Sequence, residues 1–276
     1  MFRFRKNSLL NLYLEKENET EHILVNHDPQ EAFSLGFIMR LCSKNAEVAQ
    51  RYKLWIFLAK RLGAVDHPSD CSQVNSAYCS GVFRITPSSG LNYDVFCDLD
   101  TENGSWTVFQ NRQDGEVDFY RNWADYQKGF GDLNGNFWAG LDIIHQLTLK
   151  DSVLLIELVS WSGVVAYARY SEFSIASESS GYQLSVAGFS GNVTFDAMSY
   201  HNDRGFSTYD KNDRFCASRA FGGWWYRNCY DCNLNGPYKR DNGSDIYSSM
   251  VWLKFLPNRR YVPLMKTRML VKPSDD

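Results

Sequence analysis

The motifs that would assign this chain of 276 residues to a familiar enzyme or fibre class are missing. It contains no GxSxG, HExxH or phosphate-binding glycine motif, and its five histidines are scattered. It has no Gly-X-Y repeat for a collagen stalk and too few heptads for a coiled coil. We therefore expect a protein that is not an enzyme, in which His145 and His201 are hydrogen-bonded structural residues.

A long hydrophobic run is also missing. The longest apolar run near the N-terminus, Leu54 to Ala59, is far shorter than the roughly 18 residues that cross a membrane. The first residues are basic, but Asn11 and Glu15 interrupt the apolar stretch that a signal peptide requires. We expect no membrane span, and either a start farther upstream or an unusual targeting segment.

The overall composition is that of a globular extracellular protein. A net charge of −3 gives no electrostatic reason to bind nucleic acid, and 44% hydrophobic with 15% aromatic residues is enough for a sizeable core. Seven cysteines favour an oxidising compartment, although the odd number leaves at least one thiol to explain. N-glycosylation sequons, which are compatible with secretion, begin at Asn18, Asn103, Asn192 and Asn242.

Residues 1–69 differ in character from the rest of the chain. Residues 47–62 place apolar side chains near helical spacing and predict a short amphipathic helix before Gly63 and Pro68. The helix would either dock on the following domain, belong to a poorly ordered leader, or join copies of the chain.

From residue 70 onward, short helices and strands are expected to alternate. Asn122 is predicted to cap a helix over residues 123–128 that ends at Gly129. The other expected elements are strands over 106–110, 153–161, 164–173 and 182–187, a hairpin turn at Ser162-Gly163 and a helix over 141–147. Periodicity fades after about Phe189, which predicts a C-terminal third built mainly from loops.

Aromatic residues and cysteines are densest between Cys216 and Tyr238, in CASRAFGGWWYRNCYDCNLNGPY. So many aromatic residues in a loop need a rigid frame, which a Cys216–Cys229 disulfide would supply. Closing a loop of this size removes about 3 kcal/mol of chain entropy from the unfolded state. A stapled, aromatic-walled loop of this kind is a typical place for a small ligand to bind.

Three stretches resemble the fibrinogen-related domain, the C-terminal module of fibrinogen chains, ficolins, tachylectins, tenascins and angiopoietins. They are residues 104–148, residues 189–210, and WWYRNC followed by NLNGPY. The resemblance runs roughly from Asp70 to Pro273 and implies an α+β domain over 70–276, after an N-terminal segment over 1–69. It implies a small N-terminal subdomain, a central, twisted, mainly antiparallel sheet with short helices, and a loop-rich C-terminal binding region.

The resemblance also implies two disulfides, Cys71–Cys97 and Cys216–Cys229. Three cysteines are left over: Cys79 and Cys232 could form a third bridge, and Cys42 could be free or link two chains. The Cys229-x-x-Cys232 pair could also be half of a zinc or redox site, but no second pair of ligands accompanies it.

Calcium is the one cofactor that the resemblance suggests. Many relatives hold Ca²⁺ in the loop before the cysteine that corresponds to Cys216. In this loop the chain offers oxygen atoms from Asp210, Asn212 and Asp213. The loop is about four residues shorter than in calcium-binding relatives and also contains Lys211 and Arg214. The alternative to a weak calcium site is a solvated polar turn.

A ligand pocket is expected beside the second of these disulfides. In ficolin- and tachylectin-like members the peptide bond before the second cysteine of this pair, here Cys229, is cis. The resemblance therefore makes Asn228-Cys229 the candidate cis bond, with the N–H groups of Cys229 and Tyr230 as donors to an acetyl group. Tyr247 matches an aromatic wall of the pocket, and Ser248 matches a small residue beside the methyl group.

Several residues depart from the family's pocket. Tyr230 stands where the family often has histidine, and Ala220 replaces a wall tyrosine for which the neighbouring Phe221 could substitute. Trp224, Trp225 and Trp252 are expected to pack in the core rather than to touch a ligand.

These features predict a secreted, non-enzymatic, lectin-like protein of the innate-defence type that binds acetylated or other glycans through the loops of residues 216–252. One shallow pocket binds weakly, so useful avidity requires several copies, and a homo-oligomer is expected. The alternative is a protein–protein interaction module of the angiopoietin or tenascin type that does not bind glycans.

Overall fold

The computed structural model describes residues 14–16, 19–21, 68–74, 78–240, 249–257 and 259–274. The chain divides into two compact units, one of residues 1–39 and 43–67 and the other of residues 40–42 and 68–276. In the first unit the structure describes one antiparallel hairpin, β1 (Leu14–Lys16) with β2 (Glu19–Glu21). The predicted helix over 47–62 and Cys42 lie outside the described residues, and residue 70 as a domain boundary stays a prediction.

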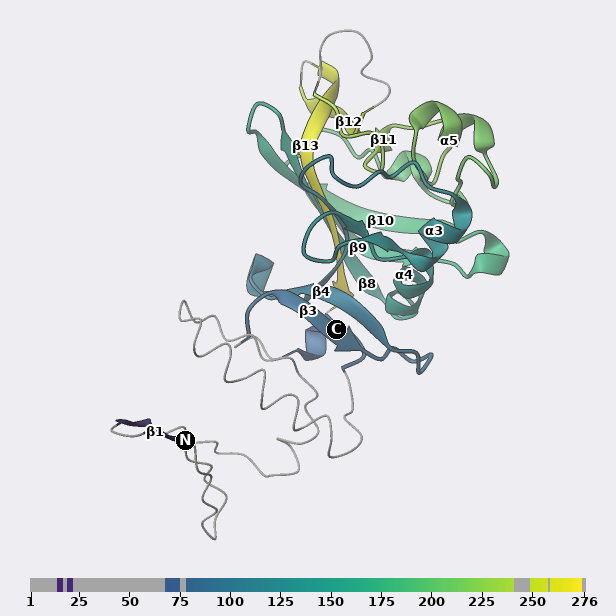
Figure 1. Ribbon diagram of the computed structural model, residues 1–276. Helices are drawn as coiled ribbons and strands as arrows, with labels where there is room; N and C mark the ends of the chain where they lie inside the picture. The colour runs from purple at the N-terminus through teal and green to yellow at the C-terminus, as the bar shows by residue number, and fades with distance from the viewer. Residues whose placement is uncertain are drawn as a thin grey trace. The chain divides into compact units, whose positions relative to one another are not determined.

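Eleven strands of the second unit form one sheet in which every described pairing is antiparallel (Figure 1). Seven of them lie in the order β10-β9-β8-β13-β5-β4-β3. Their bounds are β3 Gly81–Ile85, β4 Tyr93–Asp98, β5 Trp106–Arg112, β8 Ser152–Ser160, β9 Val165–Ile175, β10 Leu184–Gly191 and β13 Arg259–Pro273. The shorter strands are β6 Phe130–Gly131, β7 Phe137–Trp138, β11 Cys232–Asn233 and β12 Val251–Leu256.

The central strand β13 was missed by sequence reasoning, which expected loops after Phe189. β13 pairs with β8 on one side and β5 on the other, and it runs through the middle of the sheet in Figure 1. Lys266, Thr267 and Arg268 interrupt its apolar residues, so the strand reads neither as an apolar run nor as a regular alternation. Pro263 lies where β13 pairs only with β12, so its missing N–H costs no bond in the central ladder.

The predicted helices before and after β7 are confirmed. α3 (Trp123–Lys128) begins at Asn122, whose side chain accepts a hydrogen bond from the Asp125 N–H at 2.9 Å, and it ends at Gly129 with a φ of 96°. α4 (Leu141–Leu147) turns a buried apolar face toward β9 and β13. Short 3-10 turns cover Cys71–Gln73 (η1), Thr101–Asn103 (η2), Glu178–Ser180 (η3) and Ser199–His201 (η4).

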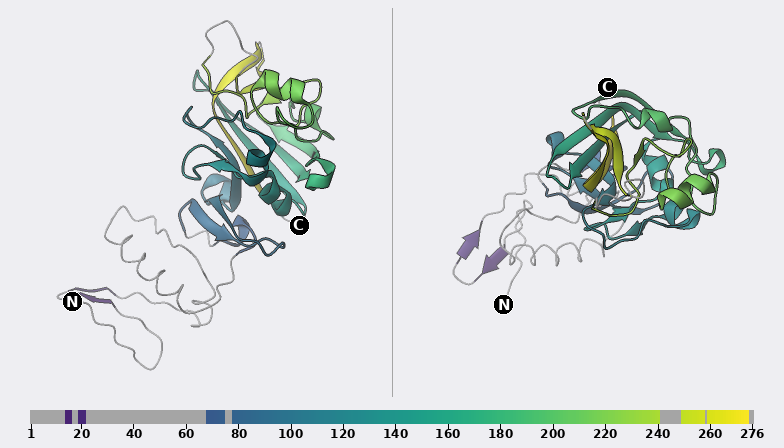
Figure 2. Two further views of the ribbon diagram at one scale, coloured as in Figure 1. Left: turned by 45° about the vertical axis from the view of Figure 1, so that its right-hand side comes forward. Right: turned by 90° about the horizontal axis from the view of Figure 1, so that it is seen from above.

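The predicted hairpin around Ser162-Gly163 joins β8 to β9, and Gly163 adopts a φ of 81° there. The strand expected over 182–187 is present as β10, shifted toward its C-terminal end. A third short helix, α5 (Arg214–Ala220), was not predicted, because it lies in a segment expected to be loop and no glycine marks its end at Phe221. α5, β11 and β12 lie at one end of the second unit, and β3 and β4 lie at the other (Figures 1 and 2).

The small N-terminal subdomain is built from η1, β3 and β4. The predicted disulfide between Cys71 and Cys97 is present and ties η1 to β4, with 5.5 Å between the Cα atoms. Both cysteines are fully buried. The subdomain therefore joins the sheet through β4, which pairs with β5.

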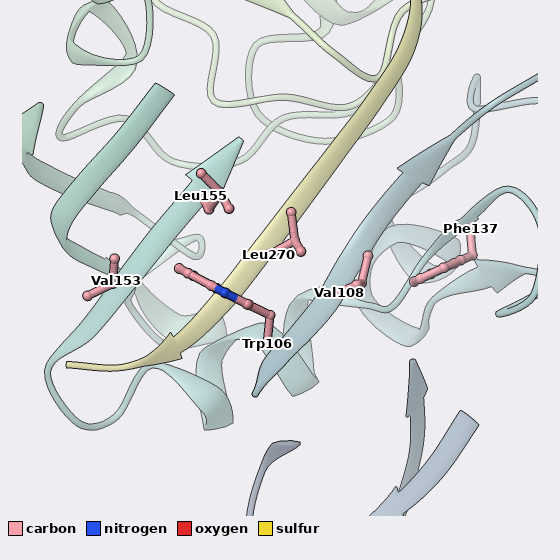
Figure 3. Packing of buried hydrophobic residues seen from close by; sticks show 6 residues of the cluster. All are labelled: Trp106, Val108, Phe137, Val153, Leu155 and Leu270. Carbon is pink, nitrogen blue, oxygen red and sulfur yellow. The ribbon is translucent and has the colours of Figure 1, made fainter. Parts of the chain in front are cut away.

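One hydrophobic cluster joins the three central strands on one face of the sheet (Figure 3). Leu270 of β13 lies directly opposite Leu155 of β8 and Val108 of β5, so the three side chains form one row across the sheet. Trp106, Val153 and Phe137 extend this row. Burial of these apolar side chains is the main force that holds the central strands in register.

Truncation of the central leucine should destabilise the domain strongly. Leu270→Ala is expected to lower the free energy of unfolding by about 2–5 kcal/mol, because it leaves a cavity among well-packed neighbours. Urea unfolding followed by tryptophan fluorescence measures this change. Leu91→Ala, at a leucine that is 61% exposed, is the control and should change the free energy by less than about 0.5 kcal/mol. Equal effects of the two substitutions would contradict the assignment of the core.

Candidate recognition site

The helix α5 supplies the frame of the candidate site. The Asp213 side chain caps it by accepting a hydrogen bond from the Cys216 N–H at 3.1 Å. The helix ends at Phe221, which is left-handed with a φ of 52°. Cys216, buried on the helix, forms the predicted disulfide with Cys229, with 4.9 Å between the Cα atoms. The loop between the two cysteines is therefore closed against the helix.

The tryptophans of this loop point into the protein, as expected. Trp224 and Trp225 are fully buried, and the Trp225 indole N–H donates to the Tyr182 carbonyl at 2.8 Å. Trp225 packs edge-on against Phe206 with 5.0 Å between ring centroids. Trp252, from β12, is also fully buried. These three tryptophans stabilise the region from within, and their side chains are not accessible to a ligand.

His201 organises the second half of the loop from within. Its Nε2 accepts hydrogen bonds from the N–H groups of Asp231 and Cys232, at 3.3 and 3.2 Å. The proton of the neutral ring therefore lies on Nδ1, which donates to the Trp225 carbonyl at 2.6 Å. Complete burial lowers the pKa of His201 to about 4. His201 therefore has the predicted structural role: its ring links three backbone groups of the loop by hydrogen bonds.

Two buried side chains of β5 hold the segment that follows. Arg112 donates to the carbonyls of Leu234 and Gly236, at 3.3 and 2.9 Å. Gln110 donates to the same Leu234 carbonyl at 3.0 Å. Burial lowers the pKa of Arg112 to about 10, so it remains charged at neutral pH, and its guanidinium lies 3.8 Å from the centre of the Phe119 ring.

The predicted cis peptide between Asn228 and Cys229 is not found, since no peptide bond among the described residues is cis. The chain turns here through left-handed φ values instead, 46° at Asn228 and 71° at Cys229. The Arg227 N–H closes the turn by donating to the Cys229 carbonyl at 2.9 Å. The N–H groups of Cys229 and Tyr230 therefore lack the cis arrangement on which the acetyl pocket was predicted.

Of the three aromatic residues predicted at the pocket, Phe221 and Tyr230 belong to different clusters. Phe221 packs on Tyr120 with 5.5 Å between ring centroids, and Tyr120 packs on Tyr209 at 4.9 Å. Tyr230, in contrast, lies between Tyr226 and Tyr261, at 6.3 and 6.4 Å.

Of the remaining positions at the predicted pocket, one lies in the core and two lie outside the described residues. Ala220, which stands in place of the family's wall tyrosine, is fully buried. The proposed pocket residues Tyr247 and Ser248 lie outside the described residues.

The three residues of the predicted calcium loop make other hydrogen bonds. Asp210 accepts hydrogen bonds from the Trp123 N–H at 3.0 Å and from Thr208 at 2.6 Å, and Asp213 caps α5. The Asn212 amide donates to the Phe206 carbonyl at 2.6 Å. Within the described residues, no group of three or more His, Cys, Asp and Glu side chains is placed to hold a metal ion. Calcium binding by this loop stays a prediction.

The bridge considered between Cys79 and Cys232 is excluded. Cys232 is a buried free thiol, whose sulfur lies 3.5 Å from the sulfur of Met198. Burial raises its pKa well above the usual value, so the thiolate form that a zinc or redox site requires is disfavoured. Cys79 is disulfide-bonded.

Of the predicted sequons, Asn192 is exposed in the turn after β10, and Asn103 lies in η2. Asn18 and Asn242 fall outside the described residues. Among the described helices, none has the length and apolar character needed to cross a bilayer.

Phe215 is the feature of this surface that sequence reasoning missed. It is 71% exposed at the start of α5, and Phe221 is 44% exposed directly after the helix ends. The sequence did not distinguish these two side chains from the buried aromatic residues around them. Because α5 was not predicted, nothing indicated which of its side chains face solvent.

Residues 67–274 match the family described as fibrinogen beta and gamma chains, C-terminal globular domain, and this chain belongs to that family. Angiopoietin-related protein 7 of mouse is 44% identical over 62% of this chain, human ficolin-3 is 42% identical over 62%, and human microfibril-associated glycoprotein 4 is 38% identical over 75%. This chain covers 53% of the mouse protein, 60% of ficolin-3 and 86% of the microfibril-associated protein. The chain thus spans about half the length of its angiopoietin-related relatives.

Solved structures agree with this assignment. The fibrinogen-like globe domain of human ANGPTL2 matches with a TM-score of 0.70 and 33% identity, over 75% of this chain and all of that one (100%). Lamprey fibrin D-dimer, in complex with the peptide Gly-His-Arg-Pro-amide, matches with a TM-score of 0.66 and 27% identity, over 83% of this chain and 84% of that one. None of the proteins named here bears the name of an enzyme.

The stability contributed by His201 should depend on pH. The unfolded side chain has a pKa near 6.5, whereas the buried ring has one of about 4. The unfolded state therefore binds more protons in this window, and the stability present above pH 6.5 is lost as the pH falls toward 4. A shift of this size corresponds to about 3 kcal/mol.

Urea unfolding of the wild type and of His201→Gln between pH 7 and pH 4 measures this contribution. Because other groups titrate equally in both proteins, the difference between them isolates His201. We expect the wild type to be more stable at pH 7 and the difference to shrink steadily as the pH falls. A difference that stays constant across the range would show that the ring is not held neutral.

Proposed function

We propose that this chain is an extracellular, non-enzymatic recognition protein whose fibrinogen-like domain binds another protein through the surface around α5. The observation that carries this proposal is the exposure of Phe215 and Phe221 at the two ends of one short helix. Large aromatic side chains exposed on one rigid element are candidate contacts for a partner. Aromatic residues are also enriched at the centres of protein interfaces.

The other exposed side chains of α5 suit the same purpose. Ser218 and Arg219 are exposed between the two phenylalanines, and Arg214 is exposed directly before Phe215. Arginine and aromatic residues supply a large share of binding energy in protein interfaces. The Asp213 cap and the Cys216–Cys229 disulfide hold the helix in place, so a partner would lose little free energy in ordering it.

The relatives support an interaction module. Two of them carry names of the angiopoietin-related and microfibril-associated kind, and one related structure holds a bound peptide. Two intrachain disulfides favour an oxidising, extracellular compartment.

Binding of acetylated glycans, in innate defence, is the second candidate. It is favoured by the similarity to ficolin-3 and by the partial exposure of Cys229 and Tyr230 beside the Tyr226 and Tyr261 rings. A single site of this kind would bind weakly, so this function requires a homo-oligomer.

Substitution of both exposed phenylalanines should remove protein binding. A panel of secreted proteins and receptor ectodomains, displayed on a surface, identifies a partner of the wild-type chain. Phe215→Ser with Phe221→Ser is expected to weaken that binding at least about 30-fold, as loss of a hot spot of 2 kcal/mol does. Leu91→Ser, which removes an exposed leucine between β3 and β4, is the matched control and should bind like the wild type. Equal binding by all three proteins would contradict the proposal.

Immobilised N-acetylglucosamine separates the two candidates. The chain, with its oligomeric state verified by light scattering, is expected to pass through without retention. Retention that free acetate reverses, and that the double phenylalanine variant preserves, would favour the glycan candidate.

We further propose that the loop of residues 210–216 needs no calcium. A ligand that binds only the folded state raises the melting temperature, so excess Ca²⁺ should shift it by less than about 1 °C. Asp210→Asn should lower the melting temperature equally with and without Ca²⁺, because the carboxylate holds the start of α3. A rise with Ca²⁺ that Asp210→Asn abolishes would show that the loop is a metal site.

A further inference from the structure

The turn after β10 holds the side chain of Asn192 in one orientation. Its Oδ1 accepts a hydrogen bond from the Tyr167 N–H at 2.7 Å, and its backbone N–H donates to the Tyr167 carbonyl at 3.1 Å. Because Oδ1 faces β9, the amide nitrogen on the same carbon points away from the strand. Asn192 and Thr194 are exposed, whereas Val193 between them is buried and anchors the turn.

An uncovered aromatic ring lies next to this asparagine. Two hydrogen bonds join Asn192 to the backbone of Tyr167, so the Tyr167 side chain leaves β9 beside the turn that carries Asn192. Tyr167 is 41% exposed, and its ring face carries the partial negative charge that attracts the C–H groups of a sugar.

The same turn ends the open half of an edge strand. β10 is the last strand of the sheet, and its first half is covered: Leu184 donates to the Arg204 carbonyl and Val186 to the Asn202 side chain, at 2.9 and 2.8 Å. From Ala187 to Asn192 every residue is exposed. Among the described residues, no hydrogen bond covers the outer side of this half. An uncovered edge of this kind invites pairing with another chain unless something shields it.

We propose that Asn192 carries an N-linked glycan whose first sugar packs on Tyr167 and whose bulk shields the open half of β10. The sequon Asn192-Val193-Thr194 has the sequence that the modification requires, and the amide nitrogen that receives the glycan faces outward. This proposal rests on the extracellular location proposed above, because N-linked glycans are added in the secretory pathway. It does not depend on the partner bound at α5.

Occupancy is tested on the full chain carrying Asn18→Gln, Asn103→Gln and Asn242→Gln, which leaves the sequon at Asn192. A foreign signal peptide sends this protein into the medium of human cells that make only oligomannose glycans. The intact mass should exceed that of the chain by one oligomannose glycan, and peptide mapping should place it on Asn192. An unmodified Asn192 in the secreted protein would overturn the proposal. Because the foreign signal imposes secretion, that result would leave the natural location untouched.

The contact with Tyr167 is tested by trimming the glycan in two ways. Endoglycosidase H leaves one sugar on Asn192, whereas peptide N-glycosidase F leaves none. The form with one sugar should melt about 3 °C higher than the form with none, a shift typical of one modest stabilising contact in a domain of this size. In Tyr167→Ser the two forms should melt within about 1 °C of each other.

Phe189→Ser is the matched control, because Phe189 packs on Tyr170, which lies on the opposite face of β9 from Tyr167. The substitution should leave the 3 °C difference unchanged. The charge created at residue 192 by complete removal is the same in every variant, so it cannot account for a difference between them. A gap that survives Tyr167→Ser, or one that Phe189→Ser abolishes, would refute the sugar contact. Light scattering should show self-association of the sugar-free form at lower concentrations than the fully glycosylated form, and equal behaviour would refute the shielding of β10.

Discussion

Hydrogen bonds from buried side chains to loop backbone hold the C-terminal region of this domain in shape. Residues 222–237 have little ladder or helix to pair their N–H and carbonyl groups, and each such group buried without a partner costs about 1–3 kcal/mol. Arg112 and Gln110, from β5, satisfy the carbonyls of residues 234 and 236. His201 joins the Trp225 carbonyl to two N–H groups beyond Cys229. The sheet thus dictates the path of a loop that lacks regular structure of its own.

This arrangement determines which side chains are left for recognition. The tryptophans of the loop pack in the core, where Trp225 contacts Trp138 of β7 and Phe206, which lies between η4 and α5. The exposed rings are those that the frame cannot bury: Phe215 and Phe221, at the two ends of a capped helix. Phe221 packs on Tyr120, whereas Tyr230 packs on Tyr261. The surface therefore has two separate aromatic clusters rather than one aromatic-walled pocket. That division favours a broad protein contact over a narrow acetyl pocket.

Local chemistry explains which elements could be predicted. The helix from Trp123 to Lys128 is bounded by an asparagine cap and a glycine, and the hairpin turn contains a glycine at positive φ, so neighbouring residues alone are enough to set them. The long strand β13 was missed because the polar residues 266–268 break up its apolar pattern. The short helix α5 was missed because it ends at Phe221, a left-handed residue that is not glycine, so no residue type marks its end. The trans peptide at Cys229 could not be foreseen either, because two left-handed residues reverse the chain there.

The amino-acid sequence by itself determined the family, the α+β class, the two disulfides and the burial of the loop tryptophans. These depend on long motifs and on residue types whose preferences are local or strongly apolar. Only the tertiary structure decided that His201 is neutral, that Asp210 holds a helix, that Cys232 has no disulfide partner and that Phe215 is exposed. Each of these properties depends on what lies across the fold, often dozens of residues away. The residues next to a side chain in the sequence do not determine whether water, a carbonyl group or another ring surrounds it in the folded protein.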